Sequence, residues 1–137
     1  MVPGLFDSTN IPVLQEVLNF ASNRHHVLAG NVANADTPGY RVRDLSVETF
    51  QQRLKDLINV QAGPSELTSP GRVGYDPNDP IRQVRETMKS IQYLDDSDVG
   101  MEQQVTEIAK NQFMYNMAVS IMNSQFRLLQ TAISERV

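Results

Sequence analysis

The sequence predicts an all-α fold in which long N- and C-terminal helices form a coiled-coil-like pair, with a short helix and an irregular loop between them. Apolar residues recur at heptad spacing near both ends, and no sustained strand pattern is present. Residues 63–80 hold four of the seven prolines and three of the seven glycines, which predicts the loop. We expect an N-terminal helix and turn over 1–40, a variable middle segment over 41–97 and a C-terminal helix over 98–137, together one domain.

The N-terminal helix is predicted from its start signals and its spacing. Asn10 stands where an N-cap is expected, and Pro12 falls in the first turn. Steps of three and four then alternate along one stripe, in which His25 is the polar member and the others are apolar or small: Ile11, Leu14, Leu18, Ala21, Leu28, Val32 and Ala35. This spacing is typical of a heptad seam that packs against a partner helix.

The C-terminal helix shows the same alternation over a longer run, with Asp98 as its expected N-cap. Its predicted seam is Met101, Val105, Ile108, Gln112, Tyr115, Val119, Met122, Phe126, Leu129 and Ile133. Gln112 is expected to fix the helix register, as a single buried amide can in coiled coils. We predict that the two terminal helices pair antiparallel, or nearly so, within one subunit.

Two shorter helices are expected in the middle segment. The first runs from Leu45 to Ile58, with Ser46 as N-cap and a hydrophobic staple between Leu45 and Phe50. A second is suggested by the spacing of Ile81, Val84, Met88 and Ile91, and begins at Asp79 and Pro80.

Charge is missing from the C-terminal helix where a solvated helix would carry it. The sixteen residues from Asn111 to Phe126 include no charged side chain, but they include three Asn, two Gln and two Ser. Heptads alone are compatible with an ordinary helical bundle. A bilayer span is excluded, because so many amides are costly in hydrocarbon. A helix enclosed by protein fits best, and other copies or related proteins are expected to supply the cover.

Composition excludes several other classes. The net charge is −4 and Lys and Arg do not cluster, which argues against nucleic-acid binding. His25 and His26 are adjacent and point about 100° apart on a helix, so they cannot ligate one metal ion together. The sequence contains no cysteine, nucleophile elbow, phosphate loop or HExxH pattern, and no basic segment followed by an apolar signal core. We therefore predict a protein that is not an enzyme, has no cofactor and carries no cleaved signal.

A motif at the end of the first helix reads as a helix stop followed by a turn. Pro38 disfavours helical geometry at Thr37, and the order Thr37-Pro38-Gly39-Tyr40 suits a type II turn. We expect polar groups here to satisfy the helix end and Tyr40 to anchor the exiting chain. The predicted assembly motif is Asn31, Asn34, Ala35, Asp36, Thr37, Pro38, Gly39 and Tyr40.

The stretch from Arg24 to Asp44, RHHVLAGNVANADTPGYRVRD, resembles the signature of the flagellar basal-body rod protein family, and within it the proximal rod proteins. The resemblance implies a structural rod subunit that assembles through its terminal helices into a helical tube, which encloses the export channel and transmits torque. It implies export through the flagellar type III apparatus and partners that include other rod proteins and the adaptor at the rod base. The alternative is a soluble helical adaptor or export chaperone, which should have charged outer faces.

Overall fold

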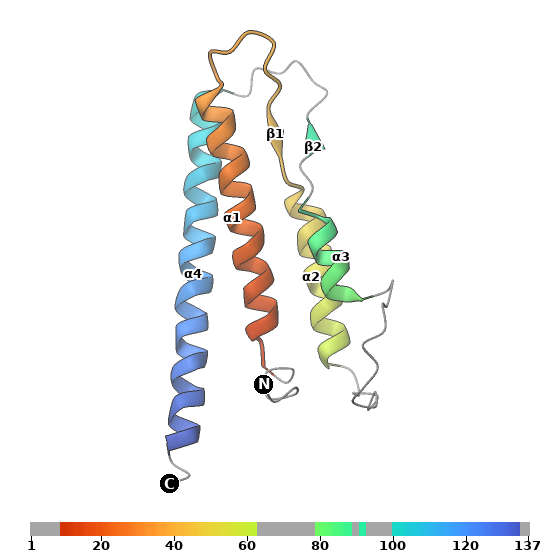
Figure 1. Ribbon diagram of the computed structural model, residues 1–137, viewed down its shortest axis with the longest axis vertical. Helices are drawn as coiled ribbons and strands as arrows, with labels where there is room; N and C mark the ends of the chain where they lie inside the picture. Colours follow the sequence, from red (N-terminus) through yellow and green to blue (C-terminus); the bar gives the residue numbers. More distant parts are fainter. Residues whose placement is uncertain (1–8, 63–78, 89–90, 93–99, 135–137) are drawn as a thin grey trace.

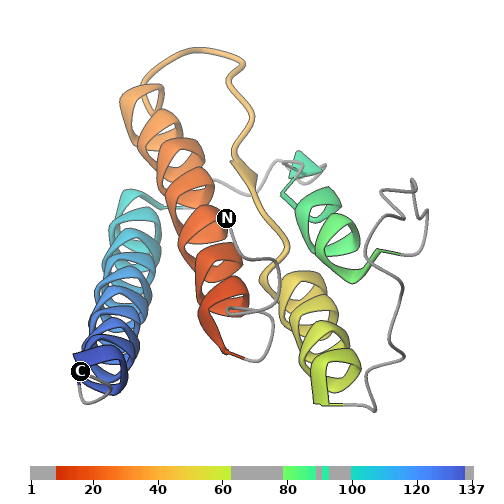
Figure 2. The ribbon, with the colours of Figure 1, turned by 60° about the horizontal axis from the view of Figure 1, so that its bottom comes forward.

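The computed structural model describes residues 9–62, 79–88, 91–92 and 100–134. Two long helices dominate it: α1, Ile11–Ala33, and α4, Met101–Ser134. They lie side by side with opposite chain directions and make the most extensive contact in the molecule (Figures 1 and 2). The predicted all-α fold and the antiparallel pairing of the terminal helices are confirmed.

The start of α1 is where the sequence places it, but the cap differs. Asn10 occupies the N-cap position without a capping bond from its side chain, and Pro12 lies in the first turn. The Ile11 N–H donates to Thr9 Oγ1 at 3.4 Å instead. For α4, the predicted cap Asp98 lies outside the described residues, as does most of the loop predicted over 63–80.

Helix α2, Val47–Ala62, begins as predicted. Ser46 Oγ accepts a hydrogen bond from the Thr49 N–H at 3.2 Å, which is the bond of an N-cap to the N3 position. Leu45 and Phe50, the residues of the expected staple, are both 2% exposed. Local sequence therefore specifies this helix start.

Helix α3, Pro80–Glu86, is shorter than the predicted one. Asp79 caps it by accepting from the Ile81 N–H at 3.0 Å, and Thr87 ends it by donating from Oγ1 to the Val84 carbonyl at 2.6 Å. Ile91 does not continue the helix. It lies in β2, Ile91–Gln92, which pairs antiparallel with β1, Arg43–Asp44, a short sheet that the sequence did not predict.

The hydrophobic core lies between α1, α2 and α3. The rings of Phe20 and Phe50 stack with their centroids 3.9 Å apart, next to Leu57 and Val84. Figure 2 shows α1 between α4 on one side and α2 and α3 on the other. The middle segment thus covers α1 on the side away from α4, whereas α4 packs against α1 alone among the described elements.

Candidate assembly site

The turn after α1 has the predicted type II geometry. The Tyr40 N–H donates to the Thr37 carbonyl at 3.1 Å, which closes the four-residue turn. Gly39 has φ +76°, the left-handed value that position three of a type II turn requires. Residues other than glycine rarely adopt this backbone conformation, which explains why glycine stands at position 39.

Exchanging glycines tests the turn. Gly39→Ala is expected to destabilise the chain by about 1–2 kcal/mol, because Cβ disfavours left-handed backbone. Gly30→Ala is the matched control: Gly30 lies in α1, and an added Cβ meets only Tyr40 Oη at 3.9 Å. Helix propensity then predicts a gain of up to about 1 kcal/mol. Urea denaturation of both variants measures the two effects, and a Gly39→Ala variant as stable as Gly30→Ala would contradict the turn assignment.

Asn31 holds the chain that leaves the turn against α1. It is 2% exposed, and its Oδ1 accepts from the Arg43 N–H at 3.1 Å while its Nδ2 donates to the Arg43 carbonyl at 2.6 Å. Nδ2 also donates to Gln104 Oε1 of α4 at 3.1 Å, and Tyr40 donates to Oδ1 at 3.1 Å. One amide therefore connects α1, the turn, β1 and α4. This role needs a donor and an acceptor on the same side chain, which an amide provides.

A buried ion pair joins Arg24 of α1 to Asp44 of β1. The Arg24 guanidinium donates to both carboxylate oxygens of Asp44, at 2.8 and 2.7 Å, and to Glu107 Oε2 of α4 at 2.8 Å. The Arg24 side chain is 7% exposed and that of Asp44 14%. The hydrogen bonds that Arg24 donates to Asp44 raise the pKa of Arg24 further above its ordinary value; burial opposes this shift, and the bond to Glu107 adds to it. The guanidinium is thus charged at every physiological pH.

Glu107 completes this cluster at its edge. Lys110 donates to Glu107 Oε1 at 2.8 Å, and this bond, followed by the bond from Arg24, lowers the pKa of Glu107. We call Arg24, Asn31, Asp44, Gln104 and Glu107 the polar cluster. It fixes the register of α4 on α1, because each of its members has partners at set positions on another element.

The other predicted motif residues lie at the surface. Asn34 Nδ2 donates to the Gly30 carbonyl at 2.8 Å, which satisfies the end of α1 as expected. Tyr40 is half-buried and donates to Asn31. Five residues of the motif are exposed on the single chain: Ala35, Asp36, Thr37, Pro38 and Gly39. Their part in assembly stays a prediction.

The face of α4 that contacts α1 lies about one residue before the predicted seam. Gln104, Asn111 and Ala118 are buried there, and Asn111 Nδ2 donates to the Ala21 carbonyl at 2.7 Å. Part of the predicted seam on α4 is exposed: Val105, Gln112, Tyr115 and Phe126. Other residues of this seam are half-buried: Ile108, Val119, Met122 and Leu129. Two of the three buried residues on the contact face are amides, so the apolar pattern indicated the neighbouring stripe.

On α1 the predicted seam is closer to the observed contacts. Leu28 is 1% exposed, whereas Leu14, Leu18 and Val32 are half-buried. His25 is exposed rather than inside a seam. Whether the exposed part of the seam contacts another subunit stays a prediction.

A second, uncharged surface of α4 faces away from α1. Phe113 is 71% exposed and Leu128 is 63% exposed. Together with exposed small polar residues they form what we call the outer face of α4: Phe113, Asn116, Met117, Ser120, Ile121, Asn123 and Leu128. No helix in the described part of the chain is long and apolar enough to cross a membrane. Exposed apolar patches on a protein surface are typical of interaction sites, so a part for this face in assembly stays a prediction.

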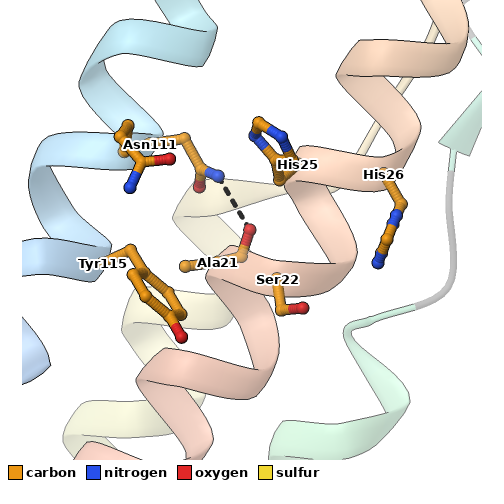
Figure 3. A pocket seen from close by; sticks show the side chains of 7 residues that line it. Ala21, Ser22, His25, His26, Asn111 and Tyr115 are labelled. Atoms are coloured by element: carbon orange, nitrogen blue, oxygen red, sulfur yellow. Dashed lines mark hydrogen bonds between the residues drawn. The ribbon is translucent and has the colours of Figure 1, made fainter.

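A pocket of about 210 Å³ opens between the two long helices (Figure 3). Its walls include Ser22, His25 and His26 of α1 and Asn111, Gln112 and Tyr115 of α4. The rings of His25 and His26 point in different directions from α1. Within the ranges that the structure describes, no three His, Asp or Glu side chains are placed to hold a metal ion.

Comparison with known proteins identifies the family. A family model described as flagella basal body rod protein matches residues 13–41, which include nearly all of α1 and the turn. Flagellar basal body rod protein FlgB of Escherichia coli K12 is 32% identical over 124 residues, covering 82% of this chain and 84% of that protein. FlgB of Salmonella typhimurium LT2 is 29% identical over 120 residues, with 82% and 84% covered.

A third relative matches this chain over nearly its whole length. FlgB of Bacillus subtilis 168 is 26% identical over 133 residues, which cover 96% of this chain and 97% of that protein. These relatives are named as rod components, which are structural proteins rather than enzymes. The buried asparagine, the type II turn and the paired long helices described above therefore lie in a chain that belongs to the flagellar basal body rod protein family.

Proposed function

We propose that the chain is a structural subunit of the proximal rod of the bacterial flagellar basal body. Its terminal helices assemble with those of other subunits into a helical tube that encloses the export channel and transmits torque. The chain leaves the cytoplasm through the flagellar type III apparatus without a cleaved signal peptide. Its partners are further copies, other rod proteins and the adaptor at the rod base.

The outer face of α4 is the observation that carries this proposal. It combines exposed apolar side chains with amides and hydroxyls, and the segment Asn111–Phe126 has no charge. Burying one large apolar side chain contributes about 1.5–3 kcal/mol. Neutral polar side chains can hydrogen-bond across a crowded interface without the cost of burying ions. A helix of this composition is suited to enclosure by several neighbours.

The soluble adaptor is the less favoured reading. An adaptor that offers one groove to a client helix keeps a solvated opposite face, which normally carries Lys, Glu or Arg. Between Asn111 and Phe126 the outer face of α4 carries no such residue, and its apolar members stand next to neutral amides. This composition supports a permanent assembly.

The proposal is tested in a motile bacterium that carries this gene. We expect a strain without the gene to be non-motile, and a tagged copy to restore motility and to copurify with basal bodies after detergent extraction. The control is a strain that lacks the flagellin filament, in which the tagged chain should still copurify. A tagged chain that restores motility but stays in the cytoplasmic fraction would reject a rod subunit and favour the adaptor.

A further inference from the structure

Helix α4 continues past the start of α1. The register of the antiparallel pair is set by the bond from Arg24 to Glu107 and by the bond from Asn111 to the Ala21 carbonyl. Because both helices rise equally per residue, this register places Ile11, the first residue of α1, beside about residue 121 of α4. Residues 122–134, which we call the extension of α4, therefore reach about 20 Å further. Figure 1 shows α4 running on beyond the start of α1.

The side of α4 that faces α1 remains apolar along the extension. Ala118 is the last buried residue on that side in the described part of α4. Met122 and Leu129 each lie within about 40° of Ala118 around the helix, and Ile133 lies about 60° from it. An apolar surface is thus continuous from the α1 interface to the end of α4.

The exposure of two adjacent leucines shows which side of the extension is covered. Leu129 lies on the α1-facing side and is half-buried, whereas Leu128, about 100° away around the helix, is 63% exposed. Gln125, one turn closer to α1 on the same side, is also half-buried. Among the described elements only α1 contacts α4. The α1-facing side is therefore less exposed than the neighbouring side even where α1 itself does not reach.

The chain that precedes α1 starts at this end of the helix pair. Residues 1–8 lie outside the described residues and join Thr9, next to the extension. Eight residues can span at most about 26–29 Å, which is enough to follow the extension to its end. Their sequence contains Val2, Leu5 and Phe6, and Asp7 is its single charged side chain. Both the length and the composition of this segment suit the apolar side of the extension.

We propose that residues 1–8 cover Met122, Leu129 and Ile133 on the extension of α4 in the same chain. The contact continues an interface that the subunit already has, using the residues that come directly before α1. Removal of apolar side chains from water on both segments favours it. The inference goes beyond the rod assignment, because it concerns the free subunit.

This contact divides the surface of α4 between its own chain and its neighbours. The α1-facing side is occupied within the subunit along its whole length, first by α1 and then by residues 1–8. A neighbouring subunit reaches that side only after it displaces residues 1–8. The outer face of α4, with Phe113 and Leu128, stays available for assembly.

An engineered tryptophan tests the contact, because the natural chain has none. Phe6→Trp is introduced into the full-length chain and measured at a concentration at which light scattering gives the mass of a monomer. We expect its emission to be shifted to shorter wavelength and its quenching by acrylamide to be several-fold weaker than that of N-acetyltryptophanamide, because a docked ring is largely removed from water. Emission and quenching equal to those of the free compound would overturn the contact and leave the rod assignment intact.

Two substitutions in the same background show where the tryptophan lies. Leu129→Asp should raise the quenching to that of an exposed tryptophan, because a carboxylate on the covered side disfavours apolar contact. Leu128→Asp is the matched control, since it places the same charge one residue away on the exposed side, and it should leave the quenching unchanged. Circular dichroism checks that both variants keep the helix content of the parent. A tryptophan that stays protected in Leu129→Asp, or that both substitutions expose equally, would overturn the proposed site.

A dilution series separates the chain's own segment from that of a second copy. Protection within one chain should be the same at every concentration that the measurement allows. Protection that appears only as the protein dimerises would show that another copy covers Leu129, and would overturn the assignment to residues 1–8 of the same chain.

Discussion

Arg24→Met is expected to destabilise the chain by about 3–5 kcal/mol, the largest loss from any single change in the polar cluster. The substitution keeps much of the apolar stem but removes the guanidinium that pairs with Asp44 and Glu107. Asp44 is then left as a charge in a site where its side chain is 14% exposed. Removing one partner of a buried pair costs far more than the pair contributes, because the other charge stays desolvated.

Arg53→Met is the matched control for this measurement. Arg53 and Asp56 are 4.0 Å apart with side chains 46% and 55% exposed. Such a surface pair contributes at most about 1 kcal/mol. Urea denaturation should therefore separate the two variants clearly, and Asp44→Leu should recover part of the loss in Arg24→Met. Equal stability of the Arg24 and Arg53 variants would show that the cluster does not fix α1 to β1 and α4.

Phe126→Asp is expected to abolish rod assembly and motility while the subunit itself remains folded and exported. The Phe126 side chain is 46% exposed on the single chain, so a carboxylate there meets solvent before assembly. In an enclosed helix the same carboxylate must be buried without a partner, at a cost of several kcal/mol. Swimming assays and counts of rods in purified basal bodies measure the effect.

The control places the same charge where α4 already carries charge. Gln103 is exposed and follows Glu102, so Gln103→Asp should leave motility near the wild-type level. Circular dichroism of both purified variants checks that neither has lost helix. If Phe126→Asp supported normal motility, the uncharged segment of α4 would not be an assembly surface.

Local signals in the sequence were sufficient for the starts of α2 and α3 and for the turn. The staple of Leu45 with Phe50 and the caps at Ser46 and Asp79 depend only on neighbours within a few residues. The same holds for Gly39 in the type II turn, because its left-handed backbone is specified by four consecutive residues. These elements needed no knowledge of the tertiary fold.

Contacts between distant residues could not be predicted in the same way. Arg24 and Asp44 pair across twenty positions, and Glu16, 2% exposed, accepts from Arg85 Nη2 of α3 at 2.9 Å. Nothing in the local pattern distinguishes Asp44, Glu16 or Arg85 from solvated charges. One signal was available, since Arg24 is the only fixed charge between Leu18 and Ala35, and such an isolated charge in an apolar helix indicates a buried partner.

The position of the α4 seam shows a second limit. A heptad pattern reports where apolar residues lie, but the contact with α1 is made partly by the amides of Gln104 and Asn111. Apolar residues of α4 therefore lie beside the contact with α1 as well as in it. Their number exceeds what one partner helix can cover, which is the reason to expect further subunits.

Oxidative footprinting of the outer face of α4 tests the central claim most directly. Phe113 and Met117 are 71% and 53% exposed on the single chain, whereas Phe20 is fully buried and serves as the internal reference. Hydroxyl radicals should modify Phe113 and Met117 readily in the free subunit and several-fold less in purified basal bodies, with Phe20 unreactive in both. Equal modification of Phe113 and Met117 in the two states would contradict enclosure of α4 by neighbouring subunits.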